Sequence, residues 1–177
     1  MKEITESEFK QVIKTKGVKG WNAWYMENEV ALEPAVGHSI EELEKELEWK
    51  IRINLYGADL SNMNLDGIIL NFATCMETIF TNTSLKGASL RGIEFTGSKL
   101  LYADLTDADL FLSILCRADL RGTILKNTSL LGIWTDAETR FDGCDFSSLR
   151  EYMPFADAVK KLLNIDITKA KVEKVED

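Results

Sequence analysis

The chain of 177 residues has few of the residue types that mark catalytic, metal-binding or disulfide-stabilised proteins. It contains one histidine, three cysteines and two prolines. An odd number of widely spaced cysteines fits neither a disulfide framework nor a metal-ligand motif. The histidine, His38, stands beside Ser39, but a triad is made by the fold and not by adjacency in sequence, so we expect His38 to be a loop residue. We therefore expect no enzyme activity, no metal and no cofactor.

Positive charge and long apolar runs are also scarce. The chain has 29 acidic and 21 basic residues, a formal net charge of -8. This acidity argues against direct nucleic-acid binding, which needs basic patches to meet phosphates. No apolar run approaches the roughly 18 residues that a membrane helix needs. The first residues, MKEITESEFKQ, are too polar for a signal peptide. These features predict a cytoplasmic protein without a membrane segment.

What the sequence has in abundance is a period of five. From Leu55 to Leu130 every fifth residue is Leu or Phe, except Cys75, a small hydrophobe that can fill the same position. Two residues earlier runs a second column, in which twelve of sixteen residues are Ala, Ser or Thr. A period of five matches neither a helix nor a flat strand. A short side with two inward side chains, followed by a corner, explains both columns, and four sides close a coil of twenty residues.

The corners and the residues before each core position carry a recognisable motif. Ten of the sixteen corners, two residues after each core residue, hold Gly or Asn, which tolerate positive φ. The pattern A(D/N)LXX starts at Ala58, Ala103, Ala108 and Ala118. In these features the chain resembles the pentapeptide-repeat family. The resemblance implies an all-β solenoid, a right-handed quadrilateral β-helix of about 4–5 coils with short helical flanking segments.

The repeat divides the chain into three parts. Residues 1–52 form an N-terminal helical and aromatic capping segment, 53–148 the pentapeptide-repeat β-helix, and 149–177 a C-terminal helix and tail. After Leu130 the core column resumes one residue out of phase, at Phe141. We therefore expect a bulge at 133–138, either a simple insertion or a functional protrusion.

Both ends of an open solenoid need caps, because end coils expose core and unpaired backbone. A capping box at Thr5–Glu8 predicts a helix that ends near Gly17, and Ser39 opens a second helix. An aromatic cluster between them is expected to pack on itself and on the first coil, with a ligand or partner site as the alternative. Its members are Trp21, Trp24 and Tyr25.

At the other end, an apolar stripe at helical spacing predicts a C-terminal helix. The helix either covers the last coil or pairs two chains as a homodimer. The residues of this stripe are Met153, Phe155, Val159, Leu162 and Leu163.

The outer surface of a solenoid should be polar, so outward apolar residues indicate a contact surface. Such residues gather in the third coil and the coil above it, and they are either a partner surface or covered by the flanking segments. The candidates are Leu101, Tyr102, Phe111, Leu112, Ile114 and Leu131.

Two functions follow from this pattern. The first is a non-catalytic interaction module, a rigid rod that binds a protein partner through its outer faces. The second comes from the resemblance, since some pentapeptide-repeat proteins that protect type II topoisomerases from quinolones are acidic rods resembling duplex DNA. A DNA mimic that binds gyrase or topoisomerase, dimerised by the C-terminal helix, is therefore the alternative. The Lys and Arg residues between the acids argue against it, because competition with DNA needs a continuous negative face. Calcium at Asp104, Asp107 and Asp109 is not expected, because the glycine–aspartate nonapeptide pattern is absent.

Overall fold

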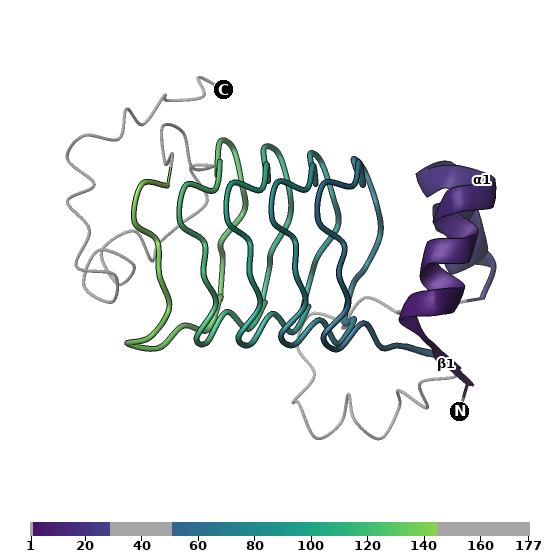
Figure 1. Ribbon diagram of the computed structural model, residues 1–177, viewed down its shortest axis with the longest axis horizontal. Coiled ribbons are helices and arrows are strands. Elements are labelled where there is room, and N and C mark those ends of the chain that lie inside the picture. Colours follow the sequence, from purple (N-terminus) through teal and green to yellow (C-terminus); the bar gives the residue numbers. More distant parts are fainter. Residues whose placement is uncertain (1, 29–50, 145–177) are drawn as a thin grey trace.

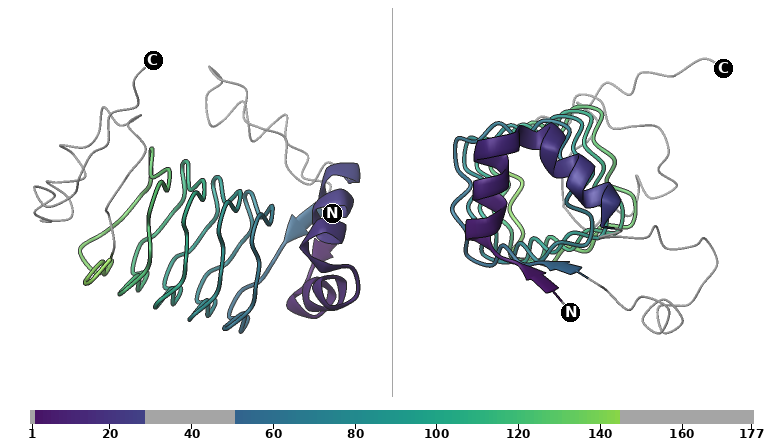
Figure 2. Two further views of the ribbon diagram at one scale, coloured as in Figure 1. Left: turned by 90° about the horizontal axis from the view of Figure 1, so that it is seen from above. Right: turned by 90° about the vertical axis from the view of Figure 1, so that its right-hand side faces the viewer.

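Parallel backbone bridges spaced twenty residues apart build the rod that the five-residue period predicts. The computed structural model describes residues 2–28 and 51–144. Along one side of the rod Asn54 pairs with Thr74, Thr74 with Glu94, and Glu94 with Ile114. The other three sides carry equivalent bridges, so successive coils stack in register. Viewed along its axis the rod is square (Figure 2), and the predicted quadrilateral coil is confirmed.

The two inward columns fill the rod as expected. The Leu and Phe column is buried throughout, Cys75 included. The hydroxyls of the second column are buried too, and most find a partner in the coil before. Thr78 Oγ1 donates to the Leu55 carbonyl at 2.6 Å, and Thr83 and Thr123 repeat the contact. This bond allows Thr and Ser to share the inner column with Ala, since a buried hydroxyl needs an acceptor.

Every corner from Gly57 to Gly132 has positive φ, whichever residue occupies it. The residue after the corner donates back across the turn, as Ala58 N does to Leu55 O at 3.0 Å, and a positive φ at the third turn residue is typical of a type II turn. The Asp or Asn of the motif supports these turns, because Asp59 Oδ1 accepts the Ser61 amide at 3.0 Å. Six corners hold neither Gly nor Asn. They are Phe72, Glu77, Tyr102, Asp107, Leu112 and Arg117.

The phase shift near the end of the repeat is confirmed. Ile114 pairs with Trp134 twenty residues on, but Asp119 pairs with Arg140, twenty-one residues on. The extra residue therefore lies between Trp134 and Arg140. Asp136 Oδ1 fixes the bulge by accepting backbone amides from Arg117 and from two nearby residues.

A strand and a kinked helix close the first coil. Strand β1 (Lys2–Ile4) pairs in parallel with β2 (Ile51–Ile53), which leads into the repeat. Helix α1 (Glu6–Glu27) opens with the predicted capping box of Thr5 and Glu8. The backbone leaves helical geometry at Gly17, as predicted. Two features were not predicted: the strand β1, and the resumption of the helix after Gly17.

The second half of α1 lies across the end of the rod (Figures 1 and 2). Its aromatic residues dock there as predicted. Trp21 and Tyr25 are buried. Trp21 Nε1 donates to the Ile69 carbonyl at 2.8 Å, and Tyr25 Oη donates to the Asn71 carbonyl at 3.1 Å. The predicted helix from Ser39, His38 beside it, and the predicted C-terminal helix lie outside the described residues.

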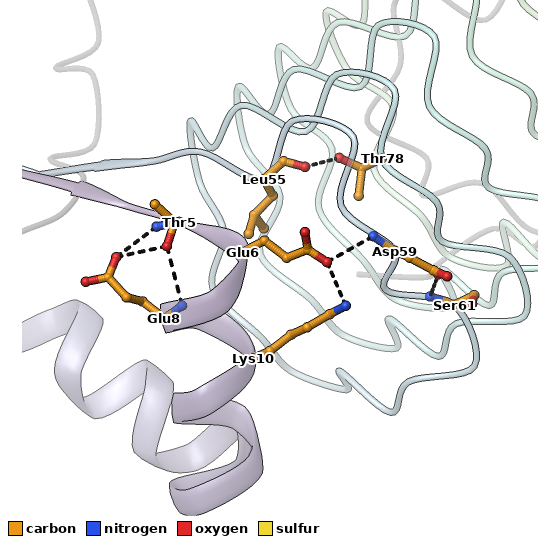
Figure 3. A network of polar contacts seen from close by, with 8 residues as sticks. All are labelled: Thr5, Glu6, Glu8, Lys10, Leu55, Asp59, Ser61 and Thr78. Carbon is orange, nitrogen blue, oxygen red and sulfur yellow. Dashed lines mark hydrogen bonds and ion pairs between the residues drawn. The ribbon is translucent and has the colours of Figure 1, made fainter.

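The first half of α1 contacts another side of the same coil. The Glu6 carboxylate accepts the Asp59 amide at 3.3 Å and pairs with Lys10 Nζ at 2.6 Å (Figure 3). The cap thus supplies partners to backbone groups that the first coil would otherwise leave open, which is how it ends the solenoid.

Candidate interaction surface

The six predicted surface residues lie at two places on the rod. Ten residues, or two sides of the square, separate Leu101 from Phe111, so Leu101 and Tyr102 occupy the corner diagonally opposite Phe111 and Leu112. The parallel bridge between Ile114 and Trp134 places Trp134 beside the second group. Sequence reasoning did not include Trp134 in this surface, although its spacing of twenty residues from Ile114 was the signal.

We define the apolar corner by the residues that the structure brings together. Leu112 N donates to Leu131 O at 3.0 Å, and Leu115 N donates to Trp134 O at 2.7 Å, so the two coils adjoin along the corner. Leu112 is 42% exposed and Trp134 65% exposed, and the other members are half-buried. The members are Phe111, Leu112, Ile114, Leu131 and Trp134.

Glycine shapes the column that contains Leu112. This column reads Phe72, Gly92, Leu112 and Gly132, one residue per coil. A Cβ at Gly92 would come within 2.5 Å of the Phe72 ring, and one at Gly132 within 2.8 Å of Leu112 Cδ2. Each large side chain therefore lies over the glycine of the next coil, so the glycine provides space as well as positive φ.

Arg91 borders the apolar corner on the side of the cap. Its guanidinium lies 5.0 Å from the centre of the Phe111 ring, and its Nε is 3.8 Å from Asp109 Oδ2. The positively charged guanidinium is attracted both to the face of the Phe111 ring and to the Asp109 carboxylate. Arg91 thus holds Phe111 in place at the edge of the surface.

The described part of the N-terminal segment does not cover the apolar corner. Helix α1 and strand β1 lie at the opposite end of the rod from residues 131–144 (Figure 1). Residues 29–50 and the predicted C-terminal helix lie outside the described residues. Within the described chain the apolar corner therefore faces solvent.

Acidic side chains flank this surface. Glu94 precedes Ile114 in the same bridged column, Asp109 lies beside Phe111, and Asp136 and Glu138 follow Trp134. Hydrogen bonds, first of all from the Arg117 amide, lower the pKa of Asp136, so it stays ionised near neutral pH. With Arg91 and Arg117 counted, the surroundings carry two more acids than bases.

Elsewhere on the rod, several acids that could form a negative face have a basic neighbour. Lys86 Nζ lies 3.1 Å from Asp104 Oδ2. Arg121 binds Asp119 through two nitrogens, at 2.8 and 2.7 Å. Among the described residues no side of the rod presents an uninterrupted column of carboxylates.

The aromatic cluster of the cap leaves a groove on α1. It has a volume of about 390 Å³ and is lined by Ile4, Ser7, Glu8, Gln11, Val12, Trp21 and Trp24. The Trp21 and Trp24 rings lie 5.2 Å apart, and Phe9 meets Trp21 edge-on at 4.8 Å. These contacts serve the packing of the cap on the first coil.

Burial keeps two of the cysteine thiols protonated. Burial raises the pKa of the Cys75 thiol, and it raises that of Cys144 to about 12. In residues 2–28 and 51–144 no three His, Cys, Asp or Glu side chains converge to hold a metal ion. No helix in this part of the chain is both long and apolar enough to span a bilayer.

Comparison with known proteins matches the geometry of the rod. A family model described as pentapeptide repeats, in 8 copies, matches residues 53–92, 78–115 and 103–133. Rfr23, a pentapeptide repeat protein of the cyanobacterium Cyanothece 51142, is 40% identical with a TM-score of 0.51, over 51% of this chain and 62% of Rfr23. This chain thus spans less than two thirds of the length of Rfr23.

A pentapeptide repeat protein of the Arabidopsis thaliana thylakoid lumen is 28% identical with a TM-score of 0.50, over 60% of this chain and 77% of its own. QnrB1, a plasmid-mediated fluoroquinolone resistance protein, is 18% identical with a TM-score of 0.24, over 56% of this chain and 61% of its own. A likeness that low has no bearing on function. No curated protein matches the chain.

Proposed function

Because residues 53–133 of this chain belong to the pentapeptide-repeat family, we propose that it is a non-catalytic interaction module, which binds a protein partner through the apolar corner of its rod. The observation that carries the proposal is the exposure of Trp134 and Leu112 beside three half-buried apolar side chains on a rigid surface. Exposed aromatic side chains on a pre-ordered scaffold are typical anchors of protein interfaces, because little conformational entropy is lost when they bind.

Rigidity supports this proposal. The side chains of the apolar corner project from a backbone whose amides and carbonyls are bonded to the neighbouring coils. Binding would therefore require little ordering of the chain, and the spacing between anchors is set by the coil repeat of about 4.8 Å.

Photo-crosslinking tests the proposal. A benzoylphenylalanine placed at Trp134 or Leu112 in the full chain, in cells of the source organism, is expected to trap a discrete protein partner. The matched control is Tyr102, which is 64% exposed but lies at the opposite corner. Cross-links of equal yield from position 102, or none from 112 and 134, would contradict the proposal.

The DNA mimic is the second candidate, and the ion pairs argue against it. A mimic of duplex DNA needs a regular row of negative charges, but Asp104, Asp109 and Asp119 each have a basic side chain within 3.8 Å. The dimer that the mimic would use depends on residues 153–163, outside the described residues. In a gyrase supercoiling assay we expect a large molar excess of the protein to change neither supercoiling nor inhibition by a quinolone. Inhibition or protection would instead support the mimic.

A further inference from the structure

We propose that the apolar corner accepts an amphipathic helix whose apolar stripe is flanked by Lys or Arg, an inference that rests on the proposed interaction function. Three features of the described residues lead to this partner: the lack of free backbone along the corner, the pattern of its anchors and the charge of its surroundings.

The backbone that joins the coils of the corner is already bonded within the rod. Leu112 N donates to Leu131 O, and Phe95 N donates to Ile114 O at 2.8 Å. A partner strand could therefore not add to this surface through main-chain hydrogen bonds, which is how β-strand addition gains its affinity. The partner must therefore be bound through side-chain contacts, and its own backbone groups must be hydrogen-bonded within the partner. A helix meets both conditions.

The anchors suit the apolar stripe of a helix. Leu112 lies over Gly132 of the next coil and is 42% exposed, and Trp134, two residues after that glycine, is 65% exposed. Phe111 and Leu131 form a half-buried floor beside them, and Arg91 fixes the Phe111 ring. Helix recognition by such surfaces uses apolar side chains three or four residues apart.

The acidic side chains around the apolar corner favour basic residues on both sides of the helix's apolar stripe. Glu94 lies next to Ile114 in the bridged column and Asp136 follows Trp134, whereas Asp109, beside Phe111, pairs with Arg91. Basic residues beside the stripe would face these carboxylates. A second copy of this chain would bring the same acids to the contact, and like charges oppose one another there. The acidic surroundings thus favour a basic partner over self-association.

Designed peptides test this inference with the full-length protein. Two helical peptides share one Leu and Phe stripe and differ only in Lys or Glu flanks, and a third keeps the Lys residues but lacks the stripe. Titration followed by fluorescence anisotropy is expected to show binding of the Lys-flanked peptide at least tenfold tighter than of either other peptide. Leu112→Ser and Trp134→Ser should each weaken it by about tenfold or more, which is typical of central anchors.

Control variants distinguish a loss of binding from a loss of folding, and the effect of charge from that of apolar contact. Tyr102→Ser, at the opposite corner, should leave the affinity unchanged, and circular dichroism should show that all variants are folded. Glu94→Gln should weaken only the Lys-flanked peptide, and added salt should do the same. If Leu112→Ser proves unfolded, Trp134→Ser alone carries the test, since Trp134 is the more exposed side chain.

Other outcomes would overturn the inference in identifiable ways. Equal binding of the Lys- and Glu-flanked peptides, lost in Trp134→Ser, would remove the basic partner and leave the proposed function intact. Dimerisation of the wild type that is lost in Trp134→Ser would make a second copy the occupant. Peptide binding seen only in Phe155→Asp would make the C-terminal residues of this chain the occupant. If neither the Lys-flanked nor the Glu-flanked peptide binds but position 134 still cross-links a protein, only this inference is overturned. If position 134 cross-links no protein either, the proposed function is overturned as well.

Discussion

At the scale of single residues, the corner positions show that glycine serves two distinct purposes in this rod. Every corner has positive φ, and six of them pay a conformational cost because they hold neither Gly nor Asn. At Gly87 only φ is at issue, because a Cβ would meet nothing within 4 Å. At Gly92 the Phe72 ring occupies the space as well.

The two glycines give a matched pair of substitutions. Gly87→Ala should lower the free energy of unfolding by about 1–2 kcal/mol, the cost of positive φ for an L-residue. Gly92→Ala should lower the free energy of unfolding by about 1–3 kcal/mol more than Gly87→Ala does, because the new methyl group displaces the Phe72 ring. Urea denaturation followed by circular dichroism compares the two. Equal losses would show that the ring moves aside at no cost.

At the scale of elements, the cap works through specific hydrogen bonds to the first coil as well as through apolar packing. The Asn22 side chain makes two of them, donating from Nδ2 to Gly67 O at 2.7 Å and accepting from Ile69 N at 3.0 Å. The amide of Asn22 thus completes the edge of the coil in the way that a neighbouring strand would.

Asn22→Ala should expose that edge. We expect faster hydrogen exchange at the Ile69 amide and a loss of about 1–3 kcal/mol, because a bonded donor and acceptor lose their partner. The Gly92 amide, which donates to Phe111 O in the interior of the rod, should keep its protection. Met26→Ala, on the same half of α1 and exposed, is the control. Unchanged exchange at Ile69 in Asn22→Ala would mean that the cap is held by its aromatic residues alone.

At the scale of the whole molecule, charge is distributed as local pairs. The net charge of -8 suggests an acidic rod, but residues of opposite sign lie next to each other on the same side of the square. Paired Asp residues are stabilised in the ionised form, as Asp119 is by its hydrogen bonds with Arg121, which lower the pKa of its carboxyl group. The protein should therefore lose stability in acid.

The sign of this effect follows from the lowered pKa. The unfolded chain takes up the proton first, near the ordinary Asp pKa of about 3.9, so the stabilisation by Asp119 is complete above that pH and fades as pH falls through the lower folded pKa. Asp119→Asn should thus be less stable than the wild type at pH 7, with the gap in melting temperature closing below about pH 4. Asp142→Asn, whose carboxylate is largely exposed and lies 3.7 Å from Arg140, is the milder control. If the difference in melting temperature does not depend on pH, the variant loses stability because the amide fits the site poorly and not because the charge is missing.

Prediction from sequence succeeded where the determining interactions repeat locally. The five-residue period fixed the inward columns, the corners and the phase shift before Phe141, because each depends on neighbours at a constant offset. Strand β1 was not predicted, because it is only three residues long and its partner, Ile51–Ile53, is far away in the sequence. The continuation of α1 past Gly17 was missed because a glycine with positive φ normally ends a helix.

The sequence by itself determined the rod: a column of Leu and Phe and a column of small residues can be buried together only in a square coil. Only the tertiary structure decided where the candidate surface lies. It placed Leu101 and Tyr102 on one corner and Phe111 and Leu112 on the opposite one, and it joined Trp134 to Ile114 through a parallel bridge. The reason is that burial is set by the repeat of five, whereas proximity on the outside is set by the closure of four sides into a coil of twenty residues.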